Sequence, residues 1–194
     1  GKRAVALSFN CVTVDGDTST NDTLLILANG QAGNKTIASS GRDNEIFQSA
    51  LTDICQALAR MIAEDGEGAT RVIRINVTGA RNEKDAQRAA KAVATSNLVK
   101  TAIFGRDANW GRIICAVGNS GAAFIPDKIT VHMGDVLLFA KGAPQVKSEE
   151  DLRRVMENRE VPIAIDLKNG AASAICWTCD LTYDYVKINA DYRT

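Results

Sequence analysis

The stretch TRVIRINVTGA, residues 70–80, carries the clearest structural signal in the chain. Apolar side chains alternate with polar ones and the pattern ends at a glycine: Val72, Ile73, Ile75 and Val77 stand against Arg71, Arg74 and Asn76, before Gly79. A period of two residues predicts a β-strand with one buried and one wet face.

Helical patterns flank this strand on both sides. NEIFQSALTDICQALARMIAE, residues 44–64, repeats apolar residues every three or four positions, which predicts an amphipathic helix with a core-facing stripe. NEKDAQRAAKAVATS, residues 82–96, predicts a second helix, with Asn82 as its N-cap and acidic residues in its first turn. Helices and strands therefore alternate in this part of the chain.

The second half of the chain adds strands and a further helix. KITVHMGDVLLFAKG, residues 128–142, predicts two short strands joined near Gly134 and Asp135, and SEEDLRRVMEN, residues 148–158, predicts a helix that begins at Ser148. VPIAIDLKNGAASAICWTCDLTY, residues 161–183, predicts a hairpin with Asn169 and Gly170 at its turn. We expect one α+β domain over residues 1–194, with a mixed sheet and helices on its faces.

Composition excludes several classes of partner. Lys plus Arg and Asp plus Glu number 23 each, with no basic run, which argues against nucleic acid and anionic membranes. No apolar segment reaches the roughly 18 residues that a membrane-spanning helix needs. The cysteines number five and three of them lie among apolar neighbours, which favours a reducing compartment. We therefore expect a soluble, cytoplasmic protein, or an organellar one in a eukaryote.

The most oxygen-rich segment is VTVDGDTSTNDTLLI, residues 12–26. Asp15, Asp17 and Ser19 have the spacing of a calcium loop, but Thr20 replaces the glycine and Ile26 replaces the bidentate glutamate. One glycine and no lysine also fail to match a phosphate-binding loop. Residues 15–23 are better interpreted as a turn whose side chains satisfy its own backbone.

Metal and histidine chemistry lack their residues. Cys176 and Cys179 in CWTC have zinc or redox spacing, but the chain has no second CxxC, and a strand would send two thiols three residues apart to opposite faces. His132, the only histidine, lies inside a strand pattern. We interpret these residues as structural and expect no metal site.

Two other features suit a binding site. Glu67 in EDGEGAT lies between Gly66 and Gly68, whose missing Cβ atoms could let a ligand approach its carboxylate. The alternative is a solvated glutamate in a helix-ending turn. The tail DYVKINADYRT, residues 184–194, is apolar enough to dock, which would hold Asn189 and Thr194 in place; docking for stability alone is the alternative.

Four long strings carry a resemblance: SFNCVTVDGDTSTNDT, EDGEGAT, SNLVKTAIFGRDANWGRI and CWTCDLTYDYVKINADYRT. They resemble, in the same order, the β chain of the bifunctional ornithine acetyltransferase and glutamate N-acetyltransferase family of arginine biosynthesis. The resemblance runs from Ser8 to Thr194. It implies an αββα-type sandwich similar to N-terminal-nucleophile hydrolases.

The family's activity follows from the same resemblance. A precursor cuts itself before a threonine into α and β chains that stay associated, as an α2β2 heterotetramer or a larger assembly. The new N-terminal threonine attacks N2-acetylornithine, with its own amino group as base. This step releases ornithine and leaves an acetyl-threonine enzyme, which then passes the acetyl group to glutamate to give N-acetylglutamate; some members also use acetyl-CoA. No other cofactor is implied.

The resemblance also assigns residues. The chain begins at Gly1 where family β chains begin at the threonine, so we expect the nucleophile upstream of Gly1 and no catalytic residue within residues 1–194. Glu67, Asn189 and Thr194 match the family's substrate-binding positions. Residues 106–112 could line the pocket or form an ion-pair network, and we assign them no ligand.

Two other hypotheses remain open. The glycine at position 1 would suit a non-catalytic fragment or interaction subunit, and a related self-processing aminopeptidase would release amino acids from peptides without acetyl transfer. An acetyl-transfer assay, with and without acetyl-CoA, separates these classes.

Overall fold

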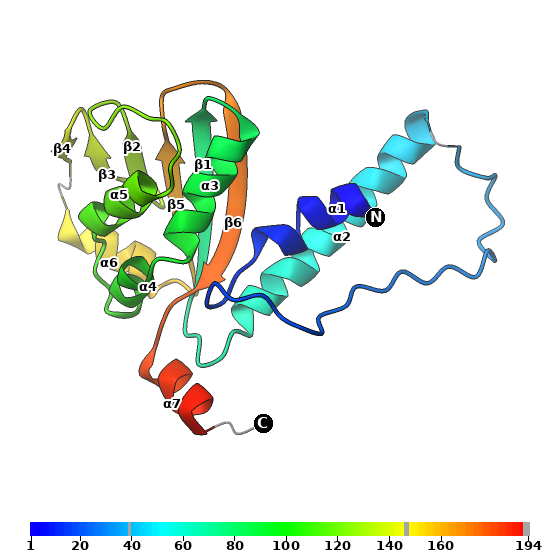
Figure 1. Ribbon diagram of the computed structural model, residues 1–194, viewed down its shortest axis with the longest axis horizontal. Coiled ribbons are helices and arrows are strands. Elements are labelled where there is room, and N and C mark those ends of the chain that lie inside the picture. Colours follow the sequence, from blue (N-terminus) through cyan, green and yellow to red (C-terminus); the bar gives the residue numbers. More distant parts are fainter. Residues whose placement is uncertain (39, 146–147, 192–194) are drawn as a thin grey trace.

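The computed structural model describes residues 1–38, 40–145 and 148–191, whose strands form one six-stranded sheet (Figure 1). Its order is β4-β3-β2-β5-β1-β6. Strands β1 and β5 pair in parallel and the other neighbours are antiparallel. The α+β class and the mixed sheet are confirmed. The strands are β1 (Val72–Ala80), β2 (Thr130–Met133), β3 (Val136–Ala140), β4 (Ala143–Pro144), β5 (Glu160–Asp166) and β6 (Ala172–Cys179).

Helices cover one face of this sheet most completely. Helices α3 and α5 lie across the sheet in Figure 1, and their apolar side chains form the main core with Ile73, Ile75 and Val77 of β1. Burying this apolar surface is the main source of stability. The helices are α1 (Lys2–Ala6), the 3-10 helix η1 (Phe9–Cys11), α2 (Arg42–Glu64), α3 (Glu83–Ala94), α4 (Asn97–Phe104), α5 (Trp110–Asn119), α6 (Glu149–Glu157) and α7 (Tyr183–Asp191).

The opposite face of β1 is more polar, as the alternation predicted. Val72 packs there with Trp177 and with Ala63 of α2. Farther along the strand, Arg74 donates to Glu160 at 2.8 Å, and Arg60 of α2 binds the other oxygen of the same carboxylate at 3.0 Å. The central strand therefore has one dry face and one that carries an ion-pair network.

Local signals predicted two helix starts and one turn correctly. Asn82 accepts a hydrogen bond from the backbone N–H of Asp85 at 2.8 Å at the start of α3, and Ser148 accepts one from Asp151 at 3.2 Å at the start of α6. Gly134, at φ +59°, lies in the turn between β2 and β3. These three boundaries confirm the sequence prediction, because each depends on contacts within a few residues.

The hairpin predicted over residues 161–183 is wrong. Strands β5 and β6 both pair with β1, which lies between them. Their connection crosses the end of β1, where the backbone N–H groups of Leu167 and Asn169 donate to the carbonyls of Thr78 and Gly79. Asn169 and Gly170 thus lie in the connection between β5 and β6, which passes over an intervening strand and is not a hairpin turn.

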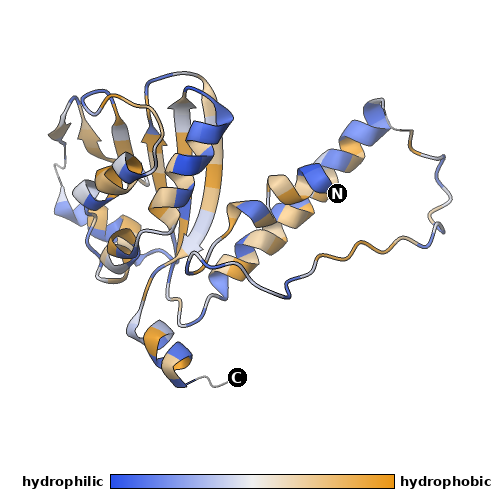
Figure 2. Ribbon diagram, in the orientation of Figure 1, coloured by the Kyte–Doolittle hydropathy of each residue, from blue (hydrophilic) through white to orange (hydrophobic). Residues whose placement is uncertain are grey.

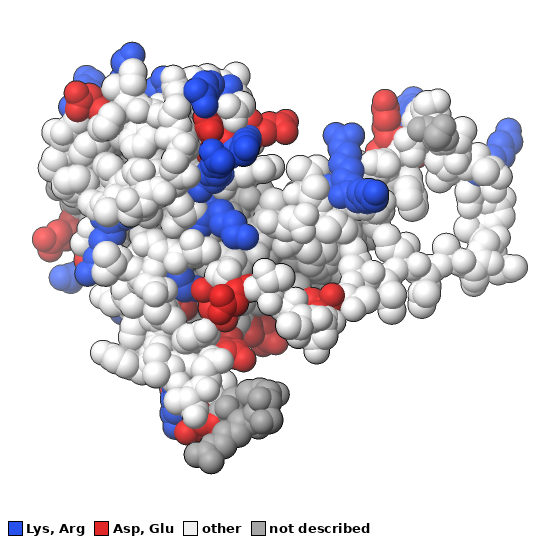
Figure 3. Space-filling model, viewed as in Figure 1, with Lys and Arg blue, Asp and Glu red and all other residues white. Residues whose placement is uncertain are grey.

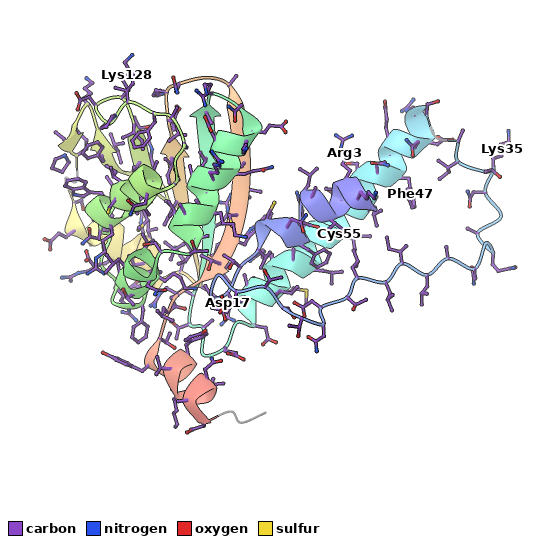
Figure 4. All side chains as sticks on the ribbon, in the orientation of Figure 1. Arg3, Asp17, Lys35, Phe47, Cys55 and Lys128 are labelled. Atoms are coloured by element: carbon purple, nitrogen blue, oxygen red, sulfur yellow. The ribbon has the colours of Figure 1, made fainter. Side chains whose placement is uncertain are left out.

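The apolar stripe predicted to face the core on α2 is also corrected. Cys55, Ala59 and Ala63 are the buried residues of this helix, whereas its large apolar side chains are exposed: Ile46, Phe47, Ile54, Leu58, Met61 and Ile62. Helix α2 extends away from the sheet with α1 beside it (Figure 1), and Phe47 projects from it in Figure 4. Its amphipathic pattern is real, but the stripe is not in the core: each of these six side chains is more than 40% exposed.

A second exposed apolar segment lies between η1 and α2. Leu24, Leu25, Ile26 and Leu27 follow one another in an extended stretch, with Leu25 75% and Leu27 91% exposed. Figure 2 shows hydrophobic colour along both this stretch and α2. An apolar run on both sides of an extended backbone is typical of a strand buried on both faces.

Candidate functional site

Glu67 lies in the turn that joins α2 to β1, between two glycines that cannot be replaced without movement. A Cβ at Gly66 would lie 2.8 Å from Cys179 Sγ, and one at Gly68, where φ is +66°, would lie 2.7 Å from the backbone nitrogen of Tyr185. The missing Cβ atoms therefore make room for the end of β6 and the start of α7. This packing is sufficient to explain why both positions are glycine.

The turn and the C-terminal helix meet at Glu67 and Asn189. The carboxylate of Glu67 accepts a hydrogen bond from Asn189 Nδ2 at 2.5 Å, and the same amide nitrogen donates to the carbonyl of Tyr185 at 3.0 Å. Both side chains are exposed. The structure thus brings together two of the three residues assigned to substrate binding, although they lie 122 positions apart. The third, Thr194, lies outside the described residues.

The turn after η1 forms a third side of this site. As predicted, it satisfies its own backbone: Gly16 N donates to Thr13 Oγ1, and Asp17 N donates to Asp15 Oδ1, both at 2.9 Å. The second carboxylate oxygen of Asp15 accepts a hydrogen bond from the Tyr185 hydroxyl at 3.0 Å. This contact, across 170 residues, was not predicted, because nothing near Asp15 in the sequence indicates it.

Negative charge dominates the surroundings. Partial burial, the hydrogen bond to Asp15 and the charges of Asp15, Glu67 and Asp17 raise the pKa of Tyr185 to about 12. Figure 3 shows acidic side chains gathered over the region where the turn after η1 approaches the lower end of α2, and Figure 4 labels Asp17 there. Three carboxylates in one place favour the binding of a cation such as an ammonium group.

A buried lysine lies beneath the site. Lys100 of α4 is only 2% exposed, and its ammonium donates to the carbonyl of Val14, next to Asp15. It also donates to Thr178 Oγ1 at 3.2 Å and lies 3.9 Å from Cys179 Sγ. Burial lowers the pKa of Lys100, and the nearby Cys179, Asp15 and Asp180 oppose that shift. In the sequence, only its position inside the apolar run NLVKTAIF indicated that Lys100 is buried.

Asp180 fixes the strand ends below the Glu67 turn. Its buried carboxylate accepts hydrogen bonds from Thr70 N at 2.8 Å, Thr70 Oγ1 at 2.5 Å and Arg71 N at 2.9 Å. Thr182 continues the connection by donating to the carbonyl of Gly68 at 2.8 Å. The segment between β6 and α7 is therefore bonded to both ends of the Glu67–Arg71 segment.

The remaining candidates have structural environments. Cys176 is paired with Ile75 and Cys179 with Val72, so the two thiols of CWTC face opposite sides of the sheet. Within the described ranges no group of His, Cys, Asp and Glu side chains is arranged to hold a metal ion.

The segment of residues 106–112 makes local contacts. Arg112 donates to the carbonyl of Leu98 at 2.8 Å, and Asn109 caps α5. The ion-pair network suggested for this segment does not form within the described part of the chain.

Among the helices that the structure describes, none has the length and apolar character to cross a bilayer.

Comparison with known proteins gives consistent relatives. The chain is 50% identical over 188 residues to the arginine biosynthesis bifunctional protein ArgJ of Bacillus licheniformis, which covers 97% of this chain and 46% of that relative. It is 49% identical over 193 residues to the ArgJ protein of Symbiobacterium thermophilum, with coverages of 100% and 48%. The chain thus spans about half the length of the curated relatives it matches.

A solved structure and a family model agree with these relatives. The crystal structure of the arginine biosynthesis bifunctional protein ArgJ from Bacillus halodurans superposes with a TM-score of 0.94 at 45% identity, covering 98% of this chain and 90% of that chain. The ArgJ family model matches residues 1–194. The chain therefore belongs to the ArgJ family.

Proposed function

We propose that this chain is most of the β chain of a bifunctional N-acetyltransferase of arginine biosynthesis. The enzyme would move the acetyl group of N2-acetylornithine to glutamate. The observation that carries the proposal is the contact between Glu67 and Asn189, at 2.5 Å, beside two further carboxylates in a chain of the ArgJ family. Glu67, Asn189 and Thr194 are the proposed substrate-binding residues.

The chemistry of the two described side chains suits an amino acid. The carboxylate of Glu67 can accept a charge-assisted hydrogen bond from an ammonium group of ornithine. Asn189 can donate through its amide nitrogen and accept through its amide oxygen, so it can bind a carboxylate or an amide of the substrate. In the free protein the two side chains bind each other, and a substrate would replace that contact with its own groups.

The proposed reaction has two balanced steps. A threonine hydroxyl attacks the acetyl carbonyl carbon of N2-acetylornithine, the amide C–N bond breaks, and the threonine's own amino group moves the hydroxyl proton to the departing amine. The amine of glutamate then attacks the acetyl ester, which releases N-acetylglutamate and restores the hydroxyl. The threonine is proposed to precede Gly1. The residues of this chain hold the amino acid and perform no bond-breaking step.

The exposed apolar surfaces support a partner from the same precursor. The α2 stripe and residues 24–27 expose more contiguous large apolar side chains than a lone globular chain usually does. This chain covers 90% of the solved ArgJ chain but only about half of each full relative. The solved chain is therefore also about half of a full relative, as expected for a protein made of two chains. We propose that the α chain covers these surfaces, in an α2β2 assembly, and supplies the second sheet of the αββα sandwich.

Acetyl transfer by the assembled protein tests the proposal. The complete coding sequence would be expressed, and the purified protein given N2-acetylornithine and isotopically labelled glutamate, with acetyl-CoA in a parallel reaction. We expect labelled N-acetylglutamate and free ornithine, and an acetyl group on a threonine peptide after brief mixing with N2-acetylornithine alone. Release of amino acids from peptides without acetyl transfer would instead identify an aminopeptidase.

Glu67→Gln tests the substrate contact. Removing the charge while keeping the shape should raise the KM for N2-acetylornithine by about tenfold to a hundredfold, since hydrogen bonds to charged groups contribute roughly 1.5–3 kcal/mol. The matched control is Glu157→Gln, which neutralises an exposed glutamate at the end of α6. Wild-type kinetics in both variants would remove Glu67 from the site.

A further inference from the structure

We propose that Lys100, Asp15 and Tyr185 are positioning residues that hold Asn189 against Glu67. The inference rests on the proposed function, because it concerns the support of the proposed substrate-binding pair. None of the three side chains would contact the substrate directly. Asp15 adds negative charge near Glu67, but its carboxylate accepts the hydrogen bond from Tyr185, and each of the three residues acts through the next.

The support begins in the protein interior. The ammonium of Lys100 is bonded to the carbonyl of Val14 and to the hydroxyl of Thr178 on β6. A buried ammonium needs such partners, because an unpaired one is costly to remove from water. It therefore ties the turn after η1 to the sheet at the residue directly before Asp15.

The second contact joins that turn to α7. Asp15 is oriented by the backbone N–H of Asp17 at 2.9 Å, and its other oxygen receives the hydroxyl of Tyr185 at 3.0 Å. A tyrosine with a pKa of about 12 stays protonated at neutral pH, so it remains a donor. The backbone N–H of Tyr185 in turn donates to Thr182 Oγ1 at 3.3 Å, which holds the start of the helix.

The last contact sets the amide of Asn189. Its Nδ2 group has two hydrogens, and its acceptors are the carbonyl of Tyr185 at 3.0 Å and the carboxylate of Glu67 at 2.5 Å. Tyr185 thus controls Asn189 twice, through the placement of α7 and through its own carbonyl. Loss of the Tyr185 hydroxyl should loosen the substrate-binding amide while leaving all groups that could touch substrate unchanged.

Tyr185→Phe in the assembled enzyme is the direct test, with Tyr183→Phe as the matched control. Tyr183 lies on the same helix, and its ring packs edge-on against Phe104 at 5.6 Å. We expect Tyr185→Phe to raise the KM for N2-acetylornithine by about tenfold, the loss of one hydrogen bond to a charged group, with kcat within about twofold. Tyr183→Phe should keep the wild-type KM.

Three further measurements separate positioning from general stability. The double variant Asp15→Ala, Tyr185→Phe should have a KM no higher than that of whichever single variant has the higher KM. The reason is that both substitutions remove the same hydrogen bond, between Asp15 and Tyr185. Lys100→Met should also raise the KM for N2-acetylornithine, as Tyr185→Phe does. Hydrogen exchange of the backbone amides of α7 should be faster in Tyr185→Phe than in wild type, with α3 unchanged.

The outcomes are distinguishable. An unchanged KM in Tyr185→Phe, a fall in kcat at constant KM, or additive effects in the double variant overturn the positioning role. If the wild-type assembly transfers no acetyl group, the proposed function fails by itself, and the exchange of α7 still decides the support: equal exchange in wild type and Tyr185→Phe rejects it. If Lys100→Met does not fold, the Tyr185 and Asp15 variants carry the test.

Discussion

At the scale of single residues, Gly68 joins the sequence to the site most directly. Its φ of +66° is unfavourable for any residue with a side chain, and its missing Cβ is replaced by the backbone of α7. The sequence showed the glycine but not its neighbour, which lies more than a hundred residues away. Steric contacts of this kind cannot be inferred from one segment alone.

Gly68→Ala should therefore destabilise the protein by more than the strain of a positive φ alone, because the added Cβ would also clash with α7. The matched control is Gly121→Ala, because Gly121 has φ +71° and nothing within 4 Å of an added Cβ. We expect about 1 kcal/mol of destabilisation for Gly121→Ala and at least about 2 kcal/mol for Gly68→Ala, together with a raised KM for N2-acetylornithine. Urea unfolding and steady-state kinetics measure the two effects. Equal costs at both positions would show that α7 yields without strain.

Cys176 gives a prediction about alkaline pH. Burial raises the pKa of its thiol from 9.0 to about 12, with a smaller contribution from Cys11. The folded protein keeps the thiol neutral where the unfolded chain would ionise it, so this contribution to stability is complete below pH 9 and is lost as the pH rises toward 12. Its full size is roughly 4 kcal/mol at most.

The stability of Cys176→Ala should therefore fall less steeply than that of wild type between pH 9 and about 11. Urea unfolding at several pH values measures the slope of the unfolding free energy against pH. The cavity left by the substitution lowers stability equally at every pH, so it does not affect the comparison of slopes. Cys115→Ala, which removes an exposed thiol on α5, is the control for the loss of a thiol as such. A Cys176→Ala slope equal to that of wild type would contradict the prediction.

At the scale of elements, sequence patterns identified structure where local contacts determine it. The alternation in β1 and the cap at Asn82 depend on neighbours within a few residues, and both were predicted correctly. Strand pairing is not local: nothing in residues 161–183 shows that β1 inserts between β5 and β6. Periodicity likewise identified α2 as amphipathic, but it could not show which surface its apolar stripe would meet.

The cap of α3 offers a prediction at this scale. Asn82 Oδ1 accepts the hydrogen bond from Asp85 N, and α3 packs on the sheet through buried alanines and Val93. Asn82→Ala should destabilise the protein by about 1 kcal/mol, and Asn82→Ser should recover most of that loss, because serine also caps well. Urea unfolding of the three proteins provides the measurement. A serine variant as unstable as the alanine variant would show that capping is not the cause.

At the scale of the whole molecule, the candidate site joins three distant parts of the chain. The resemblance assigned Glu67 and Asn189, and the structure brings them together with the turn after η1. Residue patterns alone favoured a structural turn for residues 15–23, which is correct for its backbone but misses the Asp15 contact. Lys100 was missed, because an isolated lysine in an apolar run gives no indication of its acceptors.

The apolar stripe of α2 allows the proposed α chain to be tested by a charge placed on it. Ile54 is 60% exposed, in the middle of the stripe, whereas Ser49 lies on the polar side of the same helix, five residues or roughly 140° away. Ile54→Asp should change the stability of this chain alone only modestly, since more than half of the side chain is already exposed to water. It should strongly reduce recovery of the α chain, because an aspartate would lose its water in an apolar interface.

Co-expression of both chains with an affinity tag on this one measures the effect, and Ser49→Asp serves as the control for an added charge on the helix. We expect Ser49→Asp to recover the α chain as wild type does and Ile54→Asp to recover much less, with acetyl transfer falling in proportion. Full recovery with Ile54→Asp would place the α chain elsewhere. Another protein surface would then have to cover the exposed stripe, because leaving six large apolar side chains of one helix in water is unfavourable.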